Sequence, residues 1–351
     1  MKTRKIGRNA IAKLSGVSGA TVSYALSTNN AYRVNKQTRE RILQLADELG
    51  YKPFFPGKTL ATGKSYQVGL LLPSEQVLAS QHIMAIVRGI SGKASQTDYN
   101  LVLFFKNDLA KCLSSIESRR IDGLFVVGNH LDFEVDKRAK YFPAVVVDGL
   151  KDTEGSGNVC NVRSDHEKMI GEAMDYFISQ SCGNVLGILQ GAHGADASSI
   201  ALDAFSEQCG KKASKIFGSL LTPTRNFSEQ IRGMINAGRK WDAFLINNEC
   251  LSNLVLDVLA ENGQKEGKDF QMVVYSTANQ RFSCNSYRNR VKCRRLYVEE
   301  ETKIGEKAWE VMENIFIGKK HEGKNLVPYR LWERPDPRLP CYWDSEAPAG
   351  K

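Results

Sequence analysis

Short runs of consecutive apolar residues recur along most of this chain. The clearest are VGLLL (68–72), NLVLFF (100–105), GLFVVG (123–128), AVVVDG (144–149), VLGILQG (185–191), KIFGSLL (215–221), DAFLIN (242–247) and QMVVYS (271–276). Parallel sheets covered by helices bury both faces of their strands, and such strands read as continuous apolar runs. The runs therefore predict an α/β body built on parallel sheets.

Segments with helical periodicity separate these strands. Helices are expected over residues 83–94, 109–118, 166–179, 198–209, 228–237, 251–262 and 302–317. The last helix follows LYV (296–298), and LVPYRLW (326–332) is expected to form one final strand. The strand–helix rhythm restarts after residue 149, which predicts two successive, similar lobes. Ligands of such sheets bind at the carboxyl ends of the strands, so a ligand site is expected in the cleft between the lobes.

The N-terminal stretch Asn9–Leu26 has the spacing of two short helices joined by a tight turn. Asn9 and Ser18 are expected to cap the two helices, and Gly16 supplies the left-handed residue of the turn. The predicted apolar positions are Ile11, Ala12, Leu14, Val17, Ala20 or Thr21, Val22, Ala25 and Leu26. This spacing predicts a helix-turn-helix, whose second helix presents its N-terminal side chains to base edges in the major groove. An ordinary αα-hairpin is the alternative.

A third helix is predicted over residues 36–49, with Asn35 as its N-cap. The apolar residues expected on its inner face, which would close a three-helix head, are Ile42, Leu45, Ala46 and Leu49. Arg39 and Arg41 are expected on the outer side, either as phosphate contacts or as part of a solvated face. The following stretch, residues 51–65, is rich in Pro and Gly and is predicted to be a linker.

The net charge of the chain is concentrated in the head and the linker. The whole chain has a net charge of +9, and residues 1–64 contain 12 Lys or Arg against three Asp or Glu. The remaining residues are therefore balanced in charge. A basic head on a neutral body is the electrostatic footprint of a nucleic-acid-binding domain.

The eight cysteines are scattered, with no C-x-x-C pair and no His at ligand spacing. They are expected to be reduced thiols of a cytoplasmic protein, and no metal site is predicted. No apolar run approaches the roughly 20 residues of a membrane span, and no signal peptide is evident. His166 beside Asp165 could suggest general-base chemistry, but the start of a surface helix explains both residues. Catalytic motifs are missing as well, so neither enzymatic activity nor a cofactor is predicted.

Two stretches of the head resemble the LacI/GalR family of bacterial transcription regulators. IAKLSGVSGATVSYAL (11–26) is similar to the family's V-A-x-x-A-G-V-S-x-x-T-V-S-R-x-L, and VNKQTRERILQLADELGYKP (34–53) is similar to its V-S-x-x-T-R-x-x-V and L-G-Y-x-P elements. The resemblance covers roughly residues 5–334. Weaker echoes in the body are VGLLLP (68–73), VRGI (87–90), FPAVVVDG (142–149), NNE (247–249) and TKIGEKA (302–308).

This resemblance implies a specific architecture and mode of action. The implied parts are a helix-turn-helix head (1–51), a hinge linker (52–66), a two-lobed parallel α/β body like that of periplasmic binding proteins (67–334), and a tail (335–351). The family favours a repressor that binds a near-palindromic double-stranded DNA operator as a homodimer, under control of a small molecule in the inter-lobe cleft. Its hinge helix orders on DNA and wedges a leucine, by alignment Leu60, into the minor groove. The alternative for Leu60 is a linker residue that touches the body.

The recognition helix departs from the family pattern. Gly19 and Ala20 lack hydrogen-bonding side chains, and Tyr24 stands where the family usually has Arg. Base reading would rely on the remaining polar side chains of the helix, so an unusual operator is expected. The predicted DNA-binding residues are Ser18, Gly19, Ala20, Thr21, Ser23, Tyr24, Asn35, Arg39, Lys58 and Leu60.

The effector site departs from the family as well. The predicted effector-binding residues are His82, Asp148, Ala201, Asn248 and Ser276. Asp148 and Asn248 match the family, although both could equally cap loops at strand ends. Ala201 and Ser276 stand where the family has a sugar-binding Arg and an Asp, and their loss removes charge-assisted contacts. An atypical effector, or none, is therefore expected.

A protein of another class is the remaining alternative, namely a two-lobed solute-binding or enzymatic protein with an incidental N-terminal head. The missing export signal, the missing catalytic motifs and the position of the positive charge all favour a DNA-binding regulator.

Overall fold

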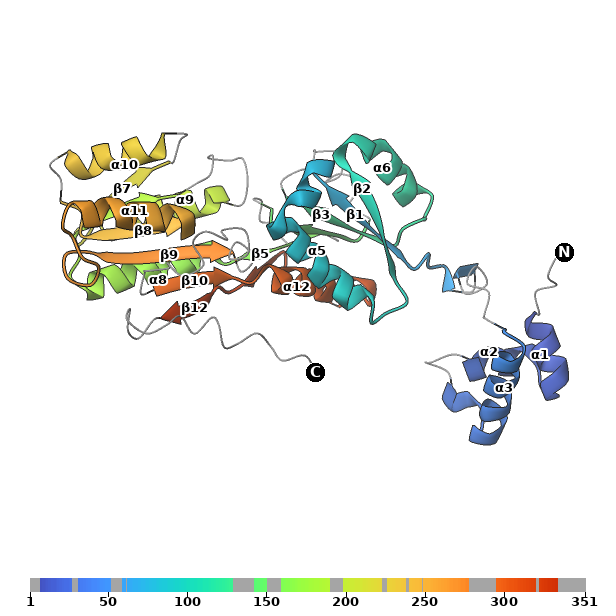
Figure 1. Cartoon of the computed structure of the whole chain (residues 1–351). Coiled ribbons are helices and arrows are strands. Elements are labelled where there is room, and N and C mark those ends of the chain that lie inside the picture. The colour runs from blue at the N-terminus through green and yellow to red at the C-terminus, as the bar shows by residue number, and fades with distance from the viewer. Residues whose placement is uncertain are drawn as a thin grey trace. The chain divides into compact units, whose positions relative to one another are not determined.

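The chain folds as two units, a head (Met1–Ser65) and a body (Tyr66–Lys351) (Figure 1). The computed structural model describes residues 7–26, 31–51, 59–60, 62–128, 142–149, 159–189, 198–222, 226–237, 240–247, 249–277, 295–319 and 322–333. In this part of the chain no helix combines the length and the apolar character that crossing a bilayer requires.

The head consists of three helices around a small apolar core. Its elements are α1 (Arg8–Ser15), α2 (Gly19–Leu26), the 3₁₀ turn η1 (Ala31–Arg33) and α3 (Lys36–Glu48). Gly16 ends α1 in the left-handed region, at a φ of 66°, as predicted. The side chains that are wholly buried at the centre are Ile11, Val22, Ala25 and Ile42. Each helix thus contributes one or two wholly buried apolar residues to the core of the predicted three-helix head, and partly buried apolar residues pack around them.

Two predictions for α1 are wrong. Gly7, not Asn9, is the N-cap, and Asn9 lies exposed in the first turn. Leu14 is 62% exposed, whereas Ser15 is buried and donates its hydroxyl to the Ile11 carbonyl at 2.6 Å. At 3.6 residues per turn, the residue four positions after Ile11 lies closest to its face. A small polar residue therefore takes the inward position, because its hydroxyl is satisfied within the helix.

The first sheet of the body has the strand order β11-β5-β4-β3-β1-β2, and all its strands are parallel. Its strands are β1 (Gln67–Leu72), β2 (Asn100–Phe105), β3 (Gly123–Val127), β4 (Ala144–Val147), β5 (Val159–Ser164) and β11 (Lys324–Val327). Its helices are α5 (Gln81–Ala94), α6 (Leu109–Glu117) and α12 (Glu301–Phe316), with short 3₁₀ turns η2 (Glu75–Ala79) and η3 (Lys106–Asp108). Helices α5 and α12 cover one face and α6 the other. The continuous apolar runs are explained by this burial on both faces.

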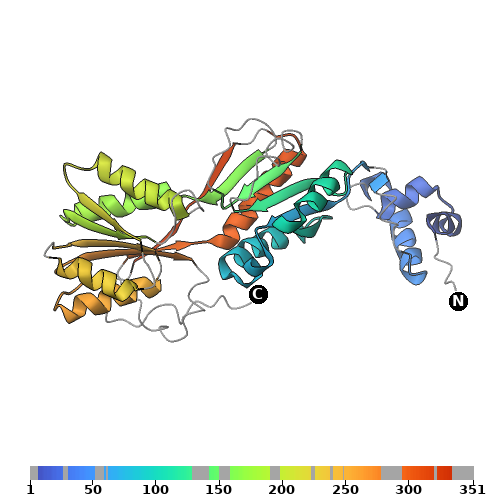
Figure 2. The ribbon, with the colours of Figure 1, turned by 90° about the horizontal axis from the view of Figure 1, so that it is seen from above.

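The second sheet has the strand order β12-β10-β9-β8-β6-β7, and only its edge strand β12 is antiparallel. Its strands are β6 (Asn184–Ile188), β7 (Phe217–Leu221), β8 (Ala243–Asn247), β9 (Gln271–Thr277), β10 (Arg295–Glu299) and β12 (Arg330–Glu333). Its helices are α8 (His166–Ser179), α9 (Ser198–Lys211), α10 (Phe227–Asn236) and α11 (Glu249–Glu261). Helices α8 and α9 cover one face, and α10 and α11 the other (Figure 2).

The sequence predicted two lobes that follow one another along the chain, and this prediction is wrong. Within the described residues the backbone passes between the sheets after β5, after β10 and after β11. Strand β5 was not predicted, because its polar residues Asn161 and Arg163 interrupt the apolar pattern, although all six of its residues are buried. The predicted single strand LVPYRLW is two strands, β11 and β12, in different sheets. Pro328, which lacks an amide donor, lies between them at the passage.

Helices α5 and α12 cross at two glycines. A Cβ atom on Gly89 would lie 2.1 Å from the Thr302 carbonyl oxygen, and one on Gly305 would lie 2.0 Å from the Ile86 carbonyl oxygen. The two backbones are therefore closer together than any side chain permits. Two segments with a weak family resemblance, VRGI and TKIGEKA, contact each other at this crossing, although they are more than 200 residues apart in the sequence.

We expect Gly89→Ala to destabilise the body by about 3 kcal/mol, because the added methyl group forces two packed backbones apart. Gly92→Ala is the matched control: it lies on the same helix, and its Cβ would meet nothing within 4 Å. The control should stabilise the body by about 1 kcal/mol through helix propensity. Urea unfolding of both variants measures the difference, and equal effects would contradict the tight crossing.

Candidate nucleic-acid interface and ligand site

The N-terminus of α2 is capped by side chains of its own first turn. The amide of Thr21 donates to Ser18 Oγ at 3.1 Å, and the Ser18 and Thr21 hydroxyls are 2.9 Å apart. Ser18 is thus the N-cap that the sequence predicted. Both hydroxyls are engaged within the helix, whereas Ala20 and Ser23 are exposed on its surface.

Arg8, which the sequence analysis did not select, lies over the start of α2. Its Nη1 atom is 3.3 Å from Ser23 Oγ, and its Nε atom is 3.2 Å from the position that a Cβ on Gly19 would occupy. Gly19 thus leaves room for a guanidinium group that comes from α1. The relevant signal in the sequence was the pairing of a basic residue at the start of α1 with a side-chain-free position at the start of α2.

Tyr24 is accompanied by a second basic residue. The guanidinium of Arg33 lies 5.2 Å from the centre of the Tyr24 ring and 5.6 Å from that of Tyr32. Such cation–π contacts hold a flexible Arg near a defined ring face. The predicted base-reading residue Tyr24 therefore carries a positive charge on its flank.

Two predicted DNA contacts on α3 have contacts within the head. Asn35 Oδ1 accepts the Thr38 amide at 2.8 Å as the helix N-cap, and Arg39 Nε donates to the Ala25 carbonyl at 3.2 Å. Arg41, although exposed, donates to the Ser15 carbonyl at 2.6 Å. The two arginines thus satisfy carbonyls at the ends of α1 and α2, where a cation also suits the helix dipole.

The end of the predicted hinge contains a helical turn. Residues 59, 60 and 62 are helical, and the Gly63 amide donates to the Thr59 carbonyl at 2.9 Å. Gly63 then has a φ of 68°, a left-handed value that ends a helix. Leu60 on this turn is 89% exposed. Lys58 lies outside the described residues.

A polar cluster forms in the body where the chain passes between the sheets. His82 Nε2 at the start of α5 is 2.9 Å from Asp148 Oδ2, just after β4. His82 Nδ1 is 3.8 Å from a carboxylate oxygen of both Glu299 and Glu301. Asp148 has a φ of 58°, which is uncommon for a residue other than Gly. The structure thus brings two predicted effector residues together and adds two acids that follow the strand LYV.

His166, the first residue of α8, belongs to the same cluster. Asp165 caps this helix by accepting the Lys168 amide at 3.1 Å, as expected of a helix start. His166 itself is only 5% exposed, so the prediction of a surface position is wrong. Its Nδ1 atom is 3.0 Å from the Tyr329 hydroxyl. One ligand atom each of Asp148, His166 and Glu299 lie within 4.8 Å of one another.

Burial and mutual charge shift the ionisation of this cluster. Burial would lower the pKa of His82, but its hydrogen bond to Asp148 and the nearby acids outweigh burial and raise the pKa well above 6.5. Burial would raise the pKa of Asp148, but His82 lowers it below its usual value. Burial raises the pKa of Glu299 to about 7 and lowers that of His166 to about 4. The cluster therefore holds a charged His82–Asp148 pair beside a neutral His166.

The other predicted effector residues occupy different surroundings. Ser276 on β9 is buried and pairs in register with Val298, one residue before Glu299. Ala201 is wholly buried in the apolar core between α9 and the second sheet, where it packs with residues such as Met169 and Phe205. Asn248 lies outside the described residues. Of the two described residues, Ser276 is the one placed beside a strand that contributes to the cluster.

Comparison with known proteins identifies the family. Residues 9–53 match the family described as bacterial regulatory proteins, lacI family. The HTH-type transcriptional regulator GalR of Streptococcus thermophilus is 30% identical over 282 residues, which cover 76% of this chain and 81% of GalR. The chain belongs to the LacI family. It is a DNA-binding transcription regulator and not an enzyme, as predicted.

Solved structures of this LacI-family fold agree with the observed architecture. A Lac repressor dimer bound to operator and the anti-inducer ONPF matches with a TM-score of 0.67 and 20% identity, covering 94% of this chain and 98% of that chain. The transcriptional regulator CelR in complex with cellobiose matches with a TM-score of 0.57 and 17% identity, covering 94% and 99%. The predicted combination of a helix-turn-helix head with a two-lobed parallel α/β body is confirmed.

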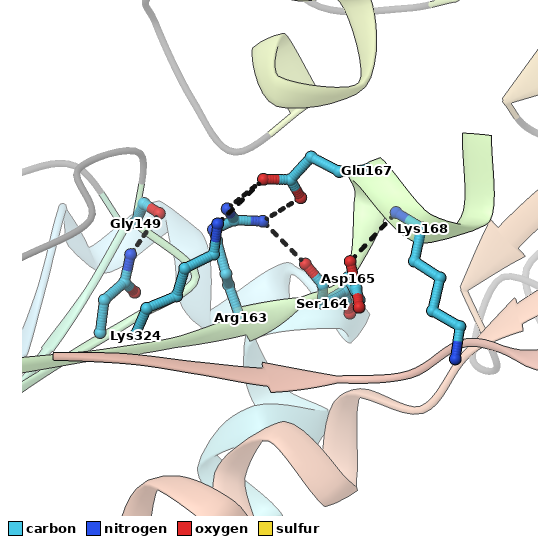
Figure 3. Close-up of polar contacts among 8 residues, drawn as sticks. Gly149, Arg163, Ser164, Asp165, Glu167, Lys168 and Lys324 are labelled. Atoms are coloured by element: carbon cyan, nitrogen blue, oxygen red, sulfur yellow. Dashed lines mark hydrogen bonds and ion pairs between the residues drawn. The ribbon is translucent and has the colours of Figure 1, made fainter. Parts of the chain in front are cut away.

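A buried arginine fixes the first passage between the lobes of this LacI-family protein (Figure 3). Arg163, 1% exposed, donates from Nη1 and Nη2 to the two carboxylate oxygens of Glu167 at 2.7 and 2.6 Å. Nη1 also donates to the Ser164 carbonyl at 3.1 Å, and Lys324 Nζ on β11 is 3.2 Å from Glu167. Planar two-point pairing of this kind sets geometry as well as energy. The network joins the end of β5, the start of α8 and β11.

We expect Glu167→Gln to destabilise the body by about 2 kcal/mol, because it removes the two-point carboxylate contact of the buried Arg163. Glu172→Gln on the same helix is the control, since Glu172 is exposed and lies 3.9 Å from the exposed Lys168. Its effect should stay within about 0.5 kcal/mol. Chemical unfolding of the two variants measures the comparison.

The stabilisation from Glu167 should also depend on pH. Burial alone would raise its pKa, but the hydrogen bonds and charge of Arg163 lower it from 4.5 to about 2. A carboxyl with a lowered folded-state pKa contributes its full stability above its unfolded pKa and loses that contribution as pH falls toward the folded pKa. The difference in unfolding free energy between wild type and Glu167→Gln should therefore shrink below about pH 4.5. A difference that grows in acid would contradict this assignment.

Proposed function

We propose that this protein is a cytoplasmic repressor that binds a near-palindromic operator as a homodimer. The observation that carries the proposal is the exposed N-terminal face of α2, flanked by Arg8 and Arg33, on a head that contains the chain's whole excess of positive charge. A two-fold dimer on DNA places two such helices in successive major grooves. The similarity to a Lac repressor dimer on its operator supports the same assembly.

Arg8 supplies the strong hydrogen-bond donor that α2 itself lacks. In the head, the Ser18 and Thr21 hydroxyls are hydrogen-bonded to each other, and Gly19 and Ala20 have no side-chain donor. The guanidinium of Arg8 lies beside Ser23 on the face that enters the major groove. Arginine contacts guanine O6 and N7 through two parallel hydrogen bonds, which is the commonest base-specific contact. Arg8 and Tyr24 therefore carry most of the sequence preference in this proposal.

Leu60 acts as the minor-groove wedge. It is an apolar side chain, 89% exposed on a helical turn. Exposure of this apolar surface to water is unfavourable in the protein without DNA. Insertion between base pairs buries that surface and bends the operator. The same insertion accounts for a leucine at a position that contacts little of the described protein.

The polar cluster around Asp148 is the effector site. Its side chains come from both lobes, so a ligand there favours one relative position of the lobes. The cluster is acidic, and the position aligned with the family's sugar-binding Arg, Ala201, is part of the apolar core. The effector is therefore atypical for the family and is recognised by carboxylates and imidazoles. The anti-inducer in the Lac repressor structure and the cellobiose in the CelR structure support small-molecule control in general.

The proposal is tested by selecting bound sequences from a random DNA library with the full-length protein. The expected result is a near-palindromic site whose half-sites are about one helical turn or less apart. A selected site without two-fold symmetry would contradict binding as a homodimer. Recovery of DNA with no preferred sequence would contradict sequence-specific operator binding. Light scattering of the protein with the selected DNA gives the stoichiometry.

We expect Arg8→Lys to relax the preference at one base pair of each half-site by about 1–3 kcal/mol, because Lys keeps the charge but lacks the planar fork. Lys13→Ala, which removes an exposed charge from the same helix, is the control and should weaken binding to all sequences alike. Repeating the selection with both variants measures the effect. An unchanged preference in Arg8→Lys would assign Arg8 to the DNA backbone instead.

A further inference from the structure

Three potential metal ligands meet at the passages between the sheets. Asp148 follows β4 of the first sheet, Glu299 ends β10 of the second sheet, and His166 begins α8 directly after the chain leaves β5. One ligand atom from each lies within 4.8 Å of the other two. Zn²⁺ binds His nitrogen and carboxylate oxygen at about 2.0–2.2 Å, so donors around one tetrahedral ion are about 3.4 Å apart. From a spacing of up to 4.8 Å, the three ligand atoms would move closer together by roughly 1 Å through side-chain rotation to share an ion.

The surroundings of His166 point to a ligand independently of the acids. Its ring is 5% exposed, and its Nε2 atom has no hydrogen-bond partner in the described part of the chain. Its other nitrogen, Nδ1, is 3.0 Å from the Tyr329 hydroxyl. An Nδ1–H that donates to Tyr329 leaves the lone pair on Nε2. A hydrogen-bond acceptor on the second nitrogen is the usual arrangement behind a metal-binding histidine, because it fixes the ring and the tautomer.

We propose that Asp148, His166 and Glu299 bind one divalent transition-metal ion of the Zn²⁺ or Mn²⁺ class. Two carboxylates and one imidazole match the ligands that these ions prefer. Burying two carboxylates without a cation is costly, and His82 compensates mainly Asp148, which it contacts at 2.9 Å. Glu299 lies farther from His82, at 3.8 Å from Nδ1, so a bound cation would add a closer partner for this carboxylate.

An ion at this site would join residues of both lobes. Because Asp148 belongs to the first sheet and Glu299 to the second, the ion favours the conformation in which the two strand ends are close. We therefore expect the metal to change operator affinity. This regulatory consequence rests on the proposed function, whereas the metal site itself does not.

The site is tested first on the full-length wild-type protein after treatment with a chelator. Titration calorimetry with Zn²⁺ and with Mn²⁺ should give about one ion per chain. X-ray absorption of the Zn²⁺ form should show nitrogen and oxygen neighbours at about 2.0–2.2 Å, with an imidazole signature. Absent binding would overturn the proposal, as would sulfur neighbours at about 2.3 Å, which indicate cysteines.

Variants then locate the ion. His166→Gln and Glu299→Gln should weaken binding by about 100-fold or more, and Tyr329→Phe by about 10-fold through loss of the hydrogen bond behind His166. Glu172→Gln, which removes an exposed carboxylate from α8, is the control and should leave affinity unchanged. Circular dichroism verifies that each variant is folded. Folded ligand variants with wild-type affinity would overturn the proposal.

Operator binding separates this proposal from the proposed function. Fluorescence anisotropy with the selected DNA is measured with and without Zn²⁺ for wild type and for Glu299→Gln. A shift in wild type that is absent in Glu299→Gln supports the regulatory consequence. Metal binding without a shift overturns that consequence alone, and lack of specific DNA binding by the wild type in both states overturns the proposed function instead.

Discussion

The contact between α5 and α12 is the constraint on which the body depends. Helix α12 follows a strand of the second sheet, yet it packs on the first, where Gly89 and Gly305 allow two backbones to cross without side chains between them. Dense packing of this kind has few alternatives, since any side chain at the crossing would collide with a carbonyl. The crossing thereby fixes the start of α12. With it, Glu299 and Glu301 are held beside Asp148, and the polar cluster is a consequence of how the lobes are connected.

The buried charges at these passages are paired at the turn from β5 to α8, but they are only partly paired in the cluster around His82. Arg163 and Glu167 form a bidentate pair that also contacts Lys324, so the turn from β5 to α8 has its charges satisfied. The cluster around His82 contains more acids than bases, and its His166 remains neutral. Arg163 is buried and Glu167 is partly exposed, and two-point pairing of their planar groups fixes the geometry of the turn. The Arg163–Glu167 pair therefore holds the backbone next to the cluster around His82 in place. The cluster, whose charges are only partly paired, is the part that could bind a ligand.

Most of the fold could be predicted from the sequence because buried parallel strands and amphipathic helices leave a local pattern. The strands at residues 100–105 and 144–147 and the helix at 166–179 follow that pattern. Strand β5 could not be predicted, since Asn161 and Arg163 are polar residues that interrupt the apolar pattern; Arg163 is buried because Glu167, four residues later, pairs with it. The same holds for the ligand cluster: Asp148 and His82 were selected by resemblance, but Glu299, Glu301 and Tyr329 become relevant only through passages that no local pattern encodes. The cysteine spacing predicted no metal site, and the proposed ligands include no cysteine.

The head shows why a recognition helix cannot be interpreted alone. Taken by itself, α2 begins with Gly19 and Ala20 and offers fewer donors to DNA than its relatives' signature implies. Gly19 is the first residue of α2, and it leaves the space beside the helix start without a side chain. Its position is explained by Arg8, whose Nε lies 3.2 Å from where the missing Cβ would be. A side chain at 19 and the guanidinium of Arg8 would compete for the same space. In the proposed function, Arg8 of α1 supplies the donor that α2 lacks, so base recognition is shared between the first and second helices.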